Sequence, residues 1–398
     1  MPVERKSKKD WRVATRMVHG GSFRSQFEET SETLYLTSGY VYQNAEEAEA
    51  AFNETHARYV YGRYGNPTIT AFEERMALLE EAEAAYAAAT GMAAIYASLM
   101  CQLRTGDRVV AGNALFSSNH YILTEMLPRF GIQSQLVDGR DLHQWEAALA
   151  SGARCVLLET PANPTLRLVD IAAISKLAHA AGATVIVDNV FATPLLQAPL
   201  KLGADIVCYS TTKHIDGQGR TLGGVVLGKK EFIEKELRPF MRHSGGYMSP
   251  FNAWVLLKGL ETIDLRIHKA VASATRIAEF LDSHDRVATV HYPRLASFPQ
   301  IELARRQMAA GGTMLSFELK GGKDSAFRFL NALETILISN NLGDSKSLAC
   351  HPFTTTHQRL SANDKAVQGV TEGLIRLSVG LEDTRDLMDD ITQAINAL

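Results

Sequence analysis

The sequence predicts an α/β protein in which a mostly parallel sheet, covered by helices, is followed by a smaller α+β domain. Apolar runs rich in β-branched residues occupy 155–158, 183–187 and 206–209, and a helical pattern at 170–182 separates the first two. Runs that are apolar at every position are typical of strands buried on both faces. Strands that alternate with helices require right-handed crossovers, so the loops after their carboxyl ends meet in one crevice.

The chain divides into an arm and two domains. Its 398 residues are enough to bury a large core. Residues 1–60 mix polar turns with a short helix at 44–52, and we expect an arm that lies on another part of the protein or on another subunit. The alternating pattern predicts a large domain over 61–260. The rhythm changes after that, which predicts a small C-terminal domain over 261–398.

Composition excludes several classes of function. The formal net charge is −3, with 46% hydrophobic and 21% charged residues, so we expect neither a nucleic-acid nor a membrane partner. No apolar stretch reaches about 18 residues, and the N-terminus does not resemble a signal peptide, so the expected location is cytoplasmic. The four cysteines and twelve histidines lack metal-binding spacings, and no metal site is expected.

An anion-binding loop opens the large domain. The segment 59–68 is rich in glycine, proline and asparagine, which favour a loop, and it presents Tyr61 and Arg63. A guanidinium matches the geometry of a phosphate. The alternative is a rigid surface turn. A helical pattern with a glutamate-rich face follows over 70–88.

A second anion-binding signal comes next. Gly91 and Met92 precede an apolar helix predicted at 93–103. Glycine just before a helix lets backbone amides close on an anion at the positive end of the helix dipole. Many helices begin this way without a ligand, so the signal counts only together with others.

Strands and helices alternate through the middle of the chain. A strand is predicted at 108–111, followed by a loop with Phe116 and a helix at 118–130. The strand at 155–158 leads into a loop rich in proline and threonine that contains Asn163. Polar residues that follow such strands lie at the crevice where ligands bind.

Two further strands frame the centre of the sheet. The helix at 170–182 is bounded by aspartate and glycine, which are cap signals. The strand at 183–187 then ends in Asp188, and another strand is predicted at 224–227. Asp188 is therefore expected at the same crevice as Asn163.

The main chemical signal follows the run 206–209, which ends in three hydroxyls and then Lys213. A lysine where a buried strand emerges lies near low-dielectric surroundings, which favour its neutral amine, and such an amine can condense with an aldehyde. Ser210 and Thr212 alternate, so both hydroxyls can face one phosphate. A merely solvated lysine is the alternative. Asp188 argues against it, because an aspartate there can pair with the pyridinium nitrogen of pyridoxal phosphate.

The C-terminal part has a different pattern. A long helix is predicted at 256–280, strands at 311–319 and 374–379, and helices at 325–333 and 384–398. This mixture is typical of an α+β domain.

One arginine and one loop of this part are candidates for substrate binding. Arg376 lies in the second predicted strand, where a buried guanidinium needs an anionic partner. A structural salt bridge to Glu382 or Asp383 is the alternative. The polar loop 338–344 is too elaborate for a simple turn.

Together these motifs resemble the Cys/Met-metabolism family of pyridoxal-phosphate (PLP) enzymes, which have the aspartate-aminotransferase-like fold, PLP fold type I. The resemblance runs from about residue 11 to the C-terminus. It rests on separated motifs in the family's order: Tyr61-Gly-Arg63 with Asn-Pro-Thr, Thr90-Gly91-Met92, Asn163-Pro-Thr, Asp188, Ser210-x-Thr212-Lys213 and Arg376-Leu-Ser-Val-Gly.

The resemblance implies how the chain would hold its cofactor, pyridoxal 5'-phosphate. Lys213 would carry the cofactor covalently and then move protons, and Asp188 would keep the pyridine nitrogen protonated. Asn163 would contact the phenolic oxygen. The phosphate would be held by the amides of Gly91 and Met92 and the hydroxyls of Ser210 and Thr212.

The resemblance also implies how substrate and subunits meet. Arg376, helped by Ser339, would bind the α-carboxylate of a small amino-acid substrate. Tyr61 and Arg63 would reach the phosphate of the neighbouring subunit, so each site would be complete only in a dimer. Two dimers would then form a homotetramer.

Two positions depart from the family pattern. Thr90 stands where many relatives have serine, which matters little if backbone amides bind the phosphate. Phe116 stands where most relatives have a tyrosine stacked on the cofactor ring. Phenylalanine can stack in the same way but cannot move a proton, so its catalytic contribution would be stacking alone.

Within the family, three segments point to one reaction: Lys213–Arg220, Ser339–Asp344 and Thr354–His357. They are most similar to members that replace the succinyl group of O-succinylhomoserine with sulfide and make homocysteine for methionine biosynthesis. The alternatives are members that use cysteine, accept the acetyl ester, or eliminate without replacement. A binding protein that keeps the fold without catalysis is the alternative from another class.

Overall fold

The large sheet has seven strands in the order β1-β7-β6-β5-β4-β2-β3 in the computed structural model, which describes residues 11–398. Strands β3, β2, β4, β5 and β6 are parallel, whereas β7 runs antiparallel to β6 and β1. The predicted mostly parallel sheet is confirmed. Its strands are β1 (Ala84–Ala88), β2 (Arg108–Gly112), β3 (Gln133–Val137), β4 (Cys155–Glu159), β5 (Thr184–Asp188), β6 (Ile206–Ser210) and β7 (Gly224–Gly228).

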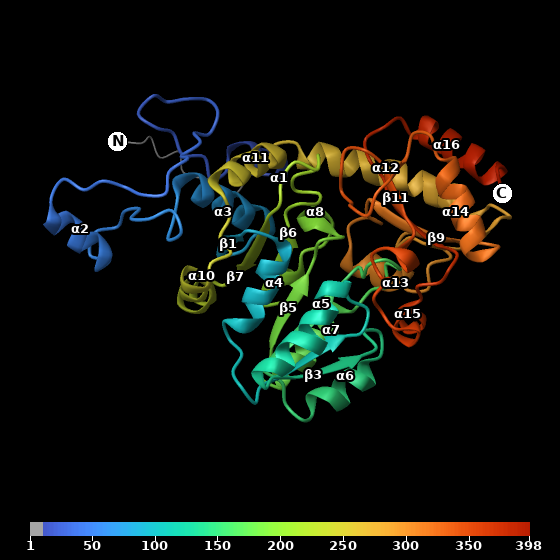
Figure 1. Ribbon diagram of the computed structural model, residues 1–398, viewed down its shortest axis with the longest axis horizontal. Coiled ribbons are helices and arrows are strands. Elements are labelled where there is room, and N and C mark those ends of the chain that lie inside the picture. Colours follow the sequence, from blue (N-terminus) through green and yellow to red (C-terminus); the bar gives the residue numbers. More distant parts are fainter. Residues whose placement is uncertain (1–10) are drawn as a thin grey trace.

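Helices cover both faces of this sheet because its central strands are apolar on both sides (Figure 1). In β4, Cys155 and Leu157 belong to one hydrophobic cluster, whereas Val156 and Leu158 belong to another on the opposite face. Successive side chains of a strand point to opposite faces, so a continuous apolar run needs two covers. One cover includes α4 (Gly91–Met100) and the π-helical turn Ile122–Met126 that continues α5 (Ser117–Tyr121). The other includes α3 (Pro67–Glu80), α6 (Leu142–Leu149), α7 (Ile171–Ala180) and α11 (Pro250–Leu260).

The C-terminal part forms a second, smaller sheet in the order β10-β11-β12-β9-β8. Its neighbouring strands are antiparallel except for the short pair β10 and β11. The strands are β8 (Val287–His291), β9 (Met314–Leu319), β10 (Leu337–Ile338), β11 (Leu348–Cys350) and β12 (Leu374–Ser378). The predicted smaller α+β domain is therefore confirmed.

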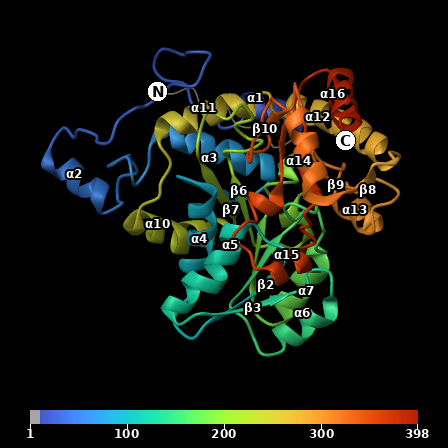
Figure 2. The ribbon, with the colours of Figure 1, turned by 45° about the vertical axis from the view of Figure 1, so that its right-hand side comes forward.

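Three helices complete the core of the smaller domain. They are α12 (Ile263–Asp282), α14 (Gly322–Ala332) and α16 (Thr384–Asn396), and they share one hydrophobic cluster with β8, β9 and β12. Figure 1 shows α12 continuing from α11 toward this domain, and the turned view in Figure 2 shows α14 and α16 beside the second sheet. The remaining helices are α1 (Val13–His19), α2 (Ala45–Phe52), α8 (Thr193–Leu196), α9 (Lys230–Phe232), α10 (Arg238–Ser244), α13 (Ile301–Gln307) and α15 (Ala362–Gln368).

Several predicted boundaries were wrong. The helix expected over 70–88 ends at Glu80, and Ala84–Ala88 is strand β1. Alanine favours a helix intrinsically, but here all five residues pair with β7 and lie under α3 and α4, so tertiary burial outweighs propensity. The helix expected over 256–280 is two helices, α11 and α12, and the strand β3 and helix α6 were missed.

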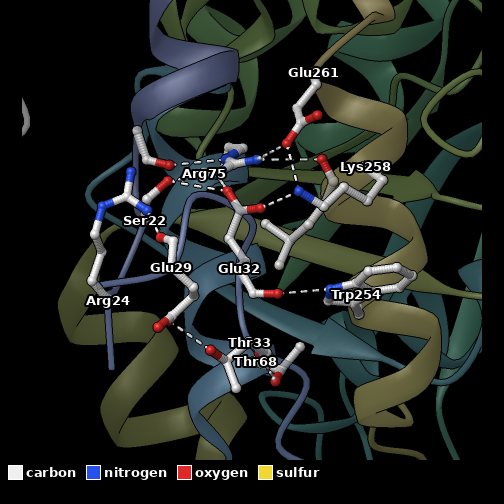
Figure 3. Close-up of polar contacts among 12 residues, drawn as sticks. Ser22, Arg24, Glu29, Glu32, Thr33, Thr68, Arg75, Trp254, Lys258 and Glu261 are labelled. Carbon is white, nitrogen blue, oxygen red and sulfur yellow. Dashed lines mark hydrogen bonds and ion pairs between the residues drawn. The ribbon is translucent and has the colours of Figure 1, made fainter. Parts of the chain in front are cut away.

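The N-terminal arm is fixed to the large domain by a buried polar network (Figure 3). Glu32 of the arm forms ion pairs with Arg75 of α3 and Lys258 of α11. Its backbone carbonyl accepts a hydrogen bond from the Trp254 indole at 2.8 Å. Beyond this anchor, Figure 1 shows α2 projecting away from the sheet. None of the helices in residues 11–398 is both long and apolar enough to cross a membrane.

Candidate active site

A cavity of about 270 Å³ opens at the carboxyl ends of β4, β5 and β6, where the smaller domain meets the large sheet. This is the place where open α/β sheets bind their ligands. Nine of the twelve site residues predicted from the sequence line it: Gly91, Met92, Phe116, Asn163, Asp188, Ser210, Thr212, Lys213 and Arg376.

Lys213 reaches the cavity from the turn that follows β6. Its Nζ donates a hydrogen bond to Oδ1 of Asn341 at 2.5 Å, and no carboxylate pairs with it within residues 11–398. Burial, and then the positive charge of Arg376, lower the pKa of this amine to about 8. A larger share of the amine is therefore neutral near physiological pH than for an exposed lysine, as the chemistry of an aldehyde-bearing cofactor requires.

Two carboxyl groups lie side by side at the strand ends. Glu159 ends β4 and is the register partner of Asp188, which ends β5. The amide of Asn119 joins them, because its Nδ2 donates to Asp188 Oδ2 at 3.0 Å and to Glu159 Oε2 at 3.4 Å. Burial raises the pKa of Asp188 to about 6, and burial together with the neighbouring Asp188 raises that of Glu159 to about 8. A cationic ring nitrogen beside Asp188 would lower the pKa of this carboxyl group again and so keep it ionised.

Glu159 also fixes the two loops that carry cavity residues. Its Oε2 accepts a hydrogen bond from the backbone N–H of Phe116 at 2.6 Å. Its Oε1 accepts one from the backbone N–H of Asn163 at 3.0 Å. One buried side chain thus positions both the aromatic ring and the amide that face the cavity.

The start of α4 also lines the cavity, with the features of an anion-binding helix N-terminus. Thr90 caps the helix, with its hydroxyl accepting a hydrogen bond from the N–H of Ala93 at 3.0 Å. The first amides of a helix, those of Gly91 and Met92, have no partner within the helix and lie at the positive end of its dipole. A Cβ on Gly91 would lie 2.6 Å from that of Ser210, so only glycine allows this close approach. The cradle, the aspartate and the lysine together fit pyridoxal phosphate.

Arg376 enters the cavity from β12 of the smaller domain and is 2% exposed. Its guanidinium donates to Asn163 Oδ1 at 3.1 Å and to the backbone carbonyls of Asn340 and Asn341 at 2.8 and 3.0 Å. Its buried Nε has no partner within residues 11–398. A buried cation that touches only neutral oxygens suits an anionic ligand.

The proposed structural salt bridge of Arg376 is not formed. Glu382 instead accepts hydrogen bonds from Ser347, and Asp383 pairs with Arg385. Both carboxylates are therefore occupied elsewhere, which leaves the substrate-binding interpretation of Arg376.

Three predicted residues do not line this cavity. Arg63 donates to the backbone carbonyl of Arg242, and its guanidinium lies 5.4 Å from the ring centroid of Tyr61, which is exposed. Ser339 is not among the lining residues, and its hydroxyl accepts a hydrogen bond from the N–H of Asn341 at 3.3 Å. Asn340 lines the wall in its place.

Sequence reasoning missed several polar residues of the site. Glu159 could have been found, because it ends a buried strand just before the Asn163 loop, as Asp188 ends the next strand. Asn341 lies within the loop that the sequence marked as elaborate. Thr356 lines the cavity, and its hydroxyl is 2.8 Å from Nδ1 of the buried His357, whose pKa is lowered to about 4 by burial and by Arg376. The family resemblance marked the segment Thr354–His357, but nothing in the sequence placed Thr356 or His357 in the cavity.

Comparisons with known proteins agree with this geometry. Residues 14–396 match the model of the family described as Cys/Met metabolism PLP-dependent enzyme. The chain is 54% identical to O-succinylhomoserine sulfhydrylase of Mycobacterium tuberculosis, over 96% of this chain and 95% of that one. It is 47% identical to the Pseudomonas aeruginosa enzyme of the same name, over 96% and 95%. A solved Campylobacter jejuni structure with N'-pyridoxyl-lysine-5'-monophosphate superposes with a TM-score of 0.92 at 31% identity, over 97% of this chain and all of that one.

Proposed function

The chain belongs to the Cys/Met metabolism family of PLP-dependent enzymes, and from this we propose that it is an O-succinylhomoserine sulfhydrylase. The reaction takes O-succinylhomoserine and hydrogen sulfide and gives homocysteine and succinate, a step toward methionine. The 54% identity to the Mycobacterium tuberculosis enzyme over nearly the whole of both chains carries the choice of this reaction. The cavity by itself suits every γ-replacement or γ-elimination of the family.

The residues of the cavity divide the work of this reaction. Bound pyridoxal phosphate supplies an aldehyde for the substrate amine and a ring that accepts electrons from bonds broken at the substrate carbons. Lys213 takes the α-proton as a neutral amine, which its lowered pKa favours. Asp188 would keep the ring nitrogen of the bound cofactor protonated. Arg376 holds the α-carboxylate and so aims the α-hydrogen at Lys213.

The γ-carbon then exchanges its substituent. Removal of a β-proton allows the bond between the γ-carbon and the ester oxygen to break, and succinate leaves with the electron pair. Sulfide adds to the same carbon, and the α- and β-protons return. Asn341, which accepts a hydrogen bond from Lys213 Nζ, holds the amine in reach of the protons that it carries.

An assay of products tests the proposal. Purified protein is given O-succinylhomoserine or O-acetylhomoserine with sulfide, with cysteine, or with no nucleophile. Homocysteine formed fastest from the succinyl ester and sulfide supports the proposal. Cystathionine as the main product would indicate a cystathionine γ-synthase, and preference for the acetyl ester an O-acetylhomoserine sulfhydrylase. Methanethiol released from methionine would indicate a methionine γ-lyase. The absence of any turnover would favour a non-catalytic binding protein.

Lys213 is the position at which the cofactor is held covalently. Its amine lies in the cavity with the anion cradle and Asp188, and these contacts support the assignment. Borohydride reduction followed by peptide mapping is expected to place the label on Lys213. A label on Lys201 or Lys229 instead would refute it.

The working unit is a dimer in which Tyr61 and Arg63 of each subunit complete the other site, and two dimers form a homotetramer. Neither residue lines the Lys213 cavity of its own chain, which supports the sharing. Mixing inactive Arg63→Ala and Lys213→Ala proteins should restore part of the activity, because a mixed dimer contains one intact site. No recovery after confirmed subunit exchange would contradict shared sites. We place the enzyme in the cytoplasm, consistent with four buried cysteines that are all unpaired.

A further inference from the structure

A second cavity, of about 520 Å³, lies between the loop 58–66 and helix α10. It shares no lining residue with the cavity of Lys213. Its walls are unusually cationic and aromatic, with two acids, Glu54 and Glu73, among them. The basic and aromatic residues are Arg58, Arg63, Arg238, Arg242, Phe52, Tyr59, Tyr64, Tyr86 and Tyr247.

Two of the four arginines already have a close carboxylate partner. Arg58 forms an ion pair with Glu47. Arg238 forms a two-point contact with Glu234, at 2.7 and 3.1 Å. These two guanidiniums are therefore neutralised by the chain itself.

The other two arginines are poorly neutralised. Arg63 has no carboxylate partner within residues 11–398 and donates instead to the carbonyl of Arg242. Arg242 has one carboxylate at 3.6 Å, that of Glu54, whose side chain is 77% exposed. The buried Nε of Arg242 has no partner among the described residues. Two neighbouring cations of this kind call for anions from outside the chain.

The two guanidiniums lie together at one ring. The centroid of Tyr64 is 5.1 Å from the guanidinium of Arg63 and 4.6 Å from that of Arg242. Both charges also act on Tyr86, whose pKa burial raises to about 12 while the arginines oppose the rise. Any site that receives Arg63 thus receives Arg242 with it.

With Lys213 reserved for the cofactor, the cavity contains one cation fewer than the proposed substrate needs. O-succinylhomoserine has an α-carboxylate and a second carboxylate at the far end of the succinyl group. Arg376 is the one arginine lining that cavity, and the α-carboxylate occupies it. O-acetylhomoserine has no second carboxylate, so the missing cation is what would distinguish the two esters.

Resting on the proposed function and its shared sites, we infer that Arg242 of the neighbouring subunit binds the distal carboxylate of the succinyl group. Arg63 takes the cofactor phosphate in the same site, and both guanidiniums contact the ring of Tyr64. Arg242 is then the residue that makes the enzyme prefer the succinyl ester to the acetyl ester.

Steady-state kinetics with both esters test the inference. In Arg242→Ala, kcat/KM for O-succinylhomoserine should fall by roughly 10- to 100-fold, the value of a charge-assisted hydrogen bond. This fall should come mainly from a higher KM. The fall in kcat/KM for O-acetylhomoserine should be at least tenfold smaller. Arg242→Lys should recover part of the preference. Arg238→Ala, which removes an already neutralised charge one turn earlier on the same helix, is the matched control and should affect both esters equally.

Cofactor content and melting temperature separate this role from a structural one. Both should stay at the wild-type level in Arg242→Ala. A variant that loses cofactor, or that loses activity equally with both esters, would overturn the inference. A wild-type enzyme without preference for the succinyl ester would refute the proposed function itself, whereas wild-type preference that persists in Arg242→Ala would refute only the role of Arg242.

Mixed dimers test whether the residue acts across the interface. In a dimer of Arg242→Ala and Lys213→Ala subunits, the site with an intact Lys213 receives Arg242 from its partner. Preference for the succinyl ester should therefore return in that mixture. If activity returns without the preference after confirmed subunit exchange, Arg242 acts within its own chain, and the inference fails.

Discussion

Two buried arginines of this protein, Arg75 and Arg376, have opposite surroundings. Arg75 fixes the N-terminal arm: its Nη2 pairs with Glu32 and also donates to Ser22, while Nε and Nη1 donate to the carbonyls of Gly20 and Leu257 (Figure 3). Arg376 pairs with no carboxylate within residues 11–398 and has an unpartnered Nε. Both side chains are almost completely excluded from solvent.

The difference shows how burial alone fails to identify a functional cation. A charge that the fold itself neutralises is part of the structure, and its loss exposes a partner charge to an apolar interior. A buried cation without an anionic partner destabilises the ligand-free protein, and an anionic ligand that binds to it removes this cost. We therefore expect changes at Arg75 to act on stability and changes at Arg376 to act on binding.

The largest effect is expected from Arg75→Ala. This change leaves the buried carboxylate of Glu32 with Lys258 as its remaining cationic partner among the described residues, and breaking such a pair costs about 3–5 kcal/mol. Urea unfolding at fixed protein and cofactor concentration should show the loss. Arg305→Ala, which removes an exposed ion pair with Glu302, should cost less than about 1 kcal/mol. Equal losses in the two variants would contradict a special role for the buried network.

The same network should make stability fall in acid. Burial by itself raises the pKa of Glu32, but Arg75 and Lys258 outweigh it and bring the pKa to about 2, below the usual 4.5. A carboxyl with a depressed pKa stabilises the fold above its unfolded pKa, and this contribution is lost as the pH falls from about 4.5 toward 2. Glu32→Gln should be less stable at pH 7, and its free energy of unfolding should change less with pH across that range. If the stability of the variant and of the wild type fell equally with pH, the loss of stability in acid would belong to other carboxyl groups.

Arg376→Ala should act on the amino acid and leave the fold intact. Loss of a charge-assisted hydrogen bond, about 1.5–3 kcal/mol, weakens binding by roughly 10- to 100-fold. Titration with an unreactive amino acid, followed through the cofactor absorption, measures the affinity. Cofactor content and the urea midpoint should stay within the range of the wild type. Loss of folding or of cofactor, with normal affinity in the remaining soluble protein, would show that Arg376 has a structural role, as Arg75 has.

The positive charge of Arg376 should also affect the pH dependence of cofactor loading. The pKa of Lys213 is lowered to about 8, so its amine is mostly protonated at pH 7 and mostly neutral at pH 9. The rate at which apoprotein takes up pyridoxal phosphate should rise about tenfold over this interval. In Arg376→Ala the rise should move to higher pH, because the guanidinium no longer disfavours the lysine's charge. An unmoved curve would show that burial alone sets the pKa.

Phe116→Tyr is expected to give the smallest effect. A phenol stacks on the cofactor as a phenyl ring does, within about 0.5–1.5 kcal/mol, so cofactor binding should not change. The added hydroxyl can deliver a proton to the unsaturated product of elimination. Part of the turnover at limiting sulfide should therefore move from homocysteine to 2-oxobutyrate. An unchanged product ratio would show that the missing hydroxyl does not control the outcome.

Local patterns were sufficient for the central strands of the large sheet and for the residues at their ends that line the cavity. The continuous apolar runs of β4, β5 and β6 announce strands buried on both faces, and the residues just after them, Asp188 and Lys213, fall at the ligand-binding edge. Such inferences use only neighbours along the chain. They failed at β1, where alanine favours a helix by itself and pairing with β7 decides otherwise.

The sequence by itself determined the fold class, the family, and the placement of Lys213 and Asp188 at one edge of the sheet. Tertiary structure alone decided that Glu159 stands opposite Asp188, that Arg376 crosses from the smaller domain to Asn163, and that no carboxylate of residues 11–398 neutralises it. The sequence alone does not distinguish Arg75 from Arg376. What separates them is which distant groups packing brings within hydrogen-bond range, and that follows from the whole fold rather than from any local segment.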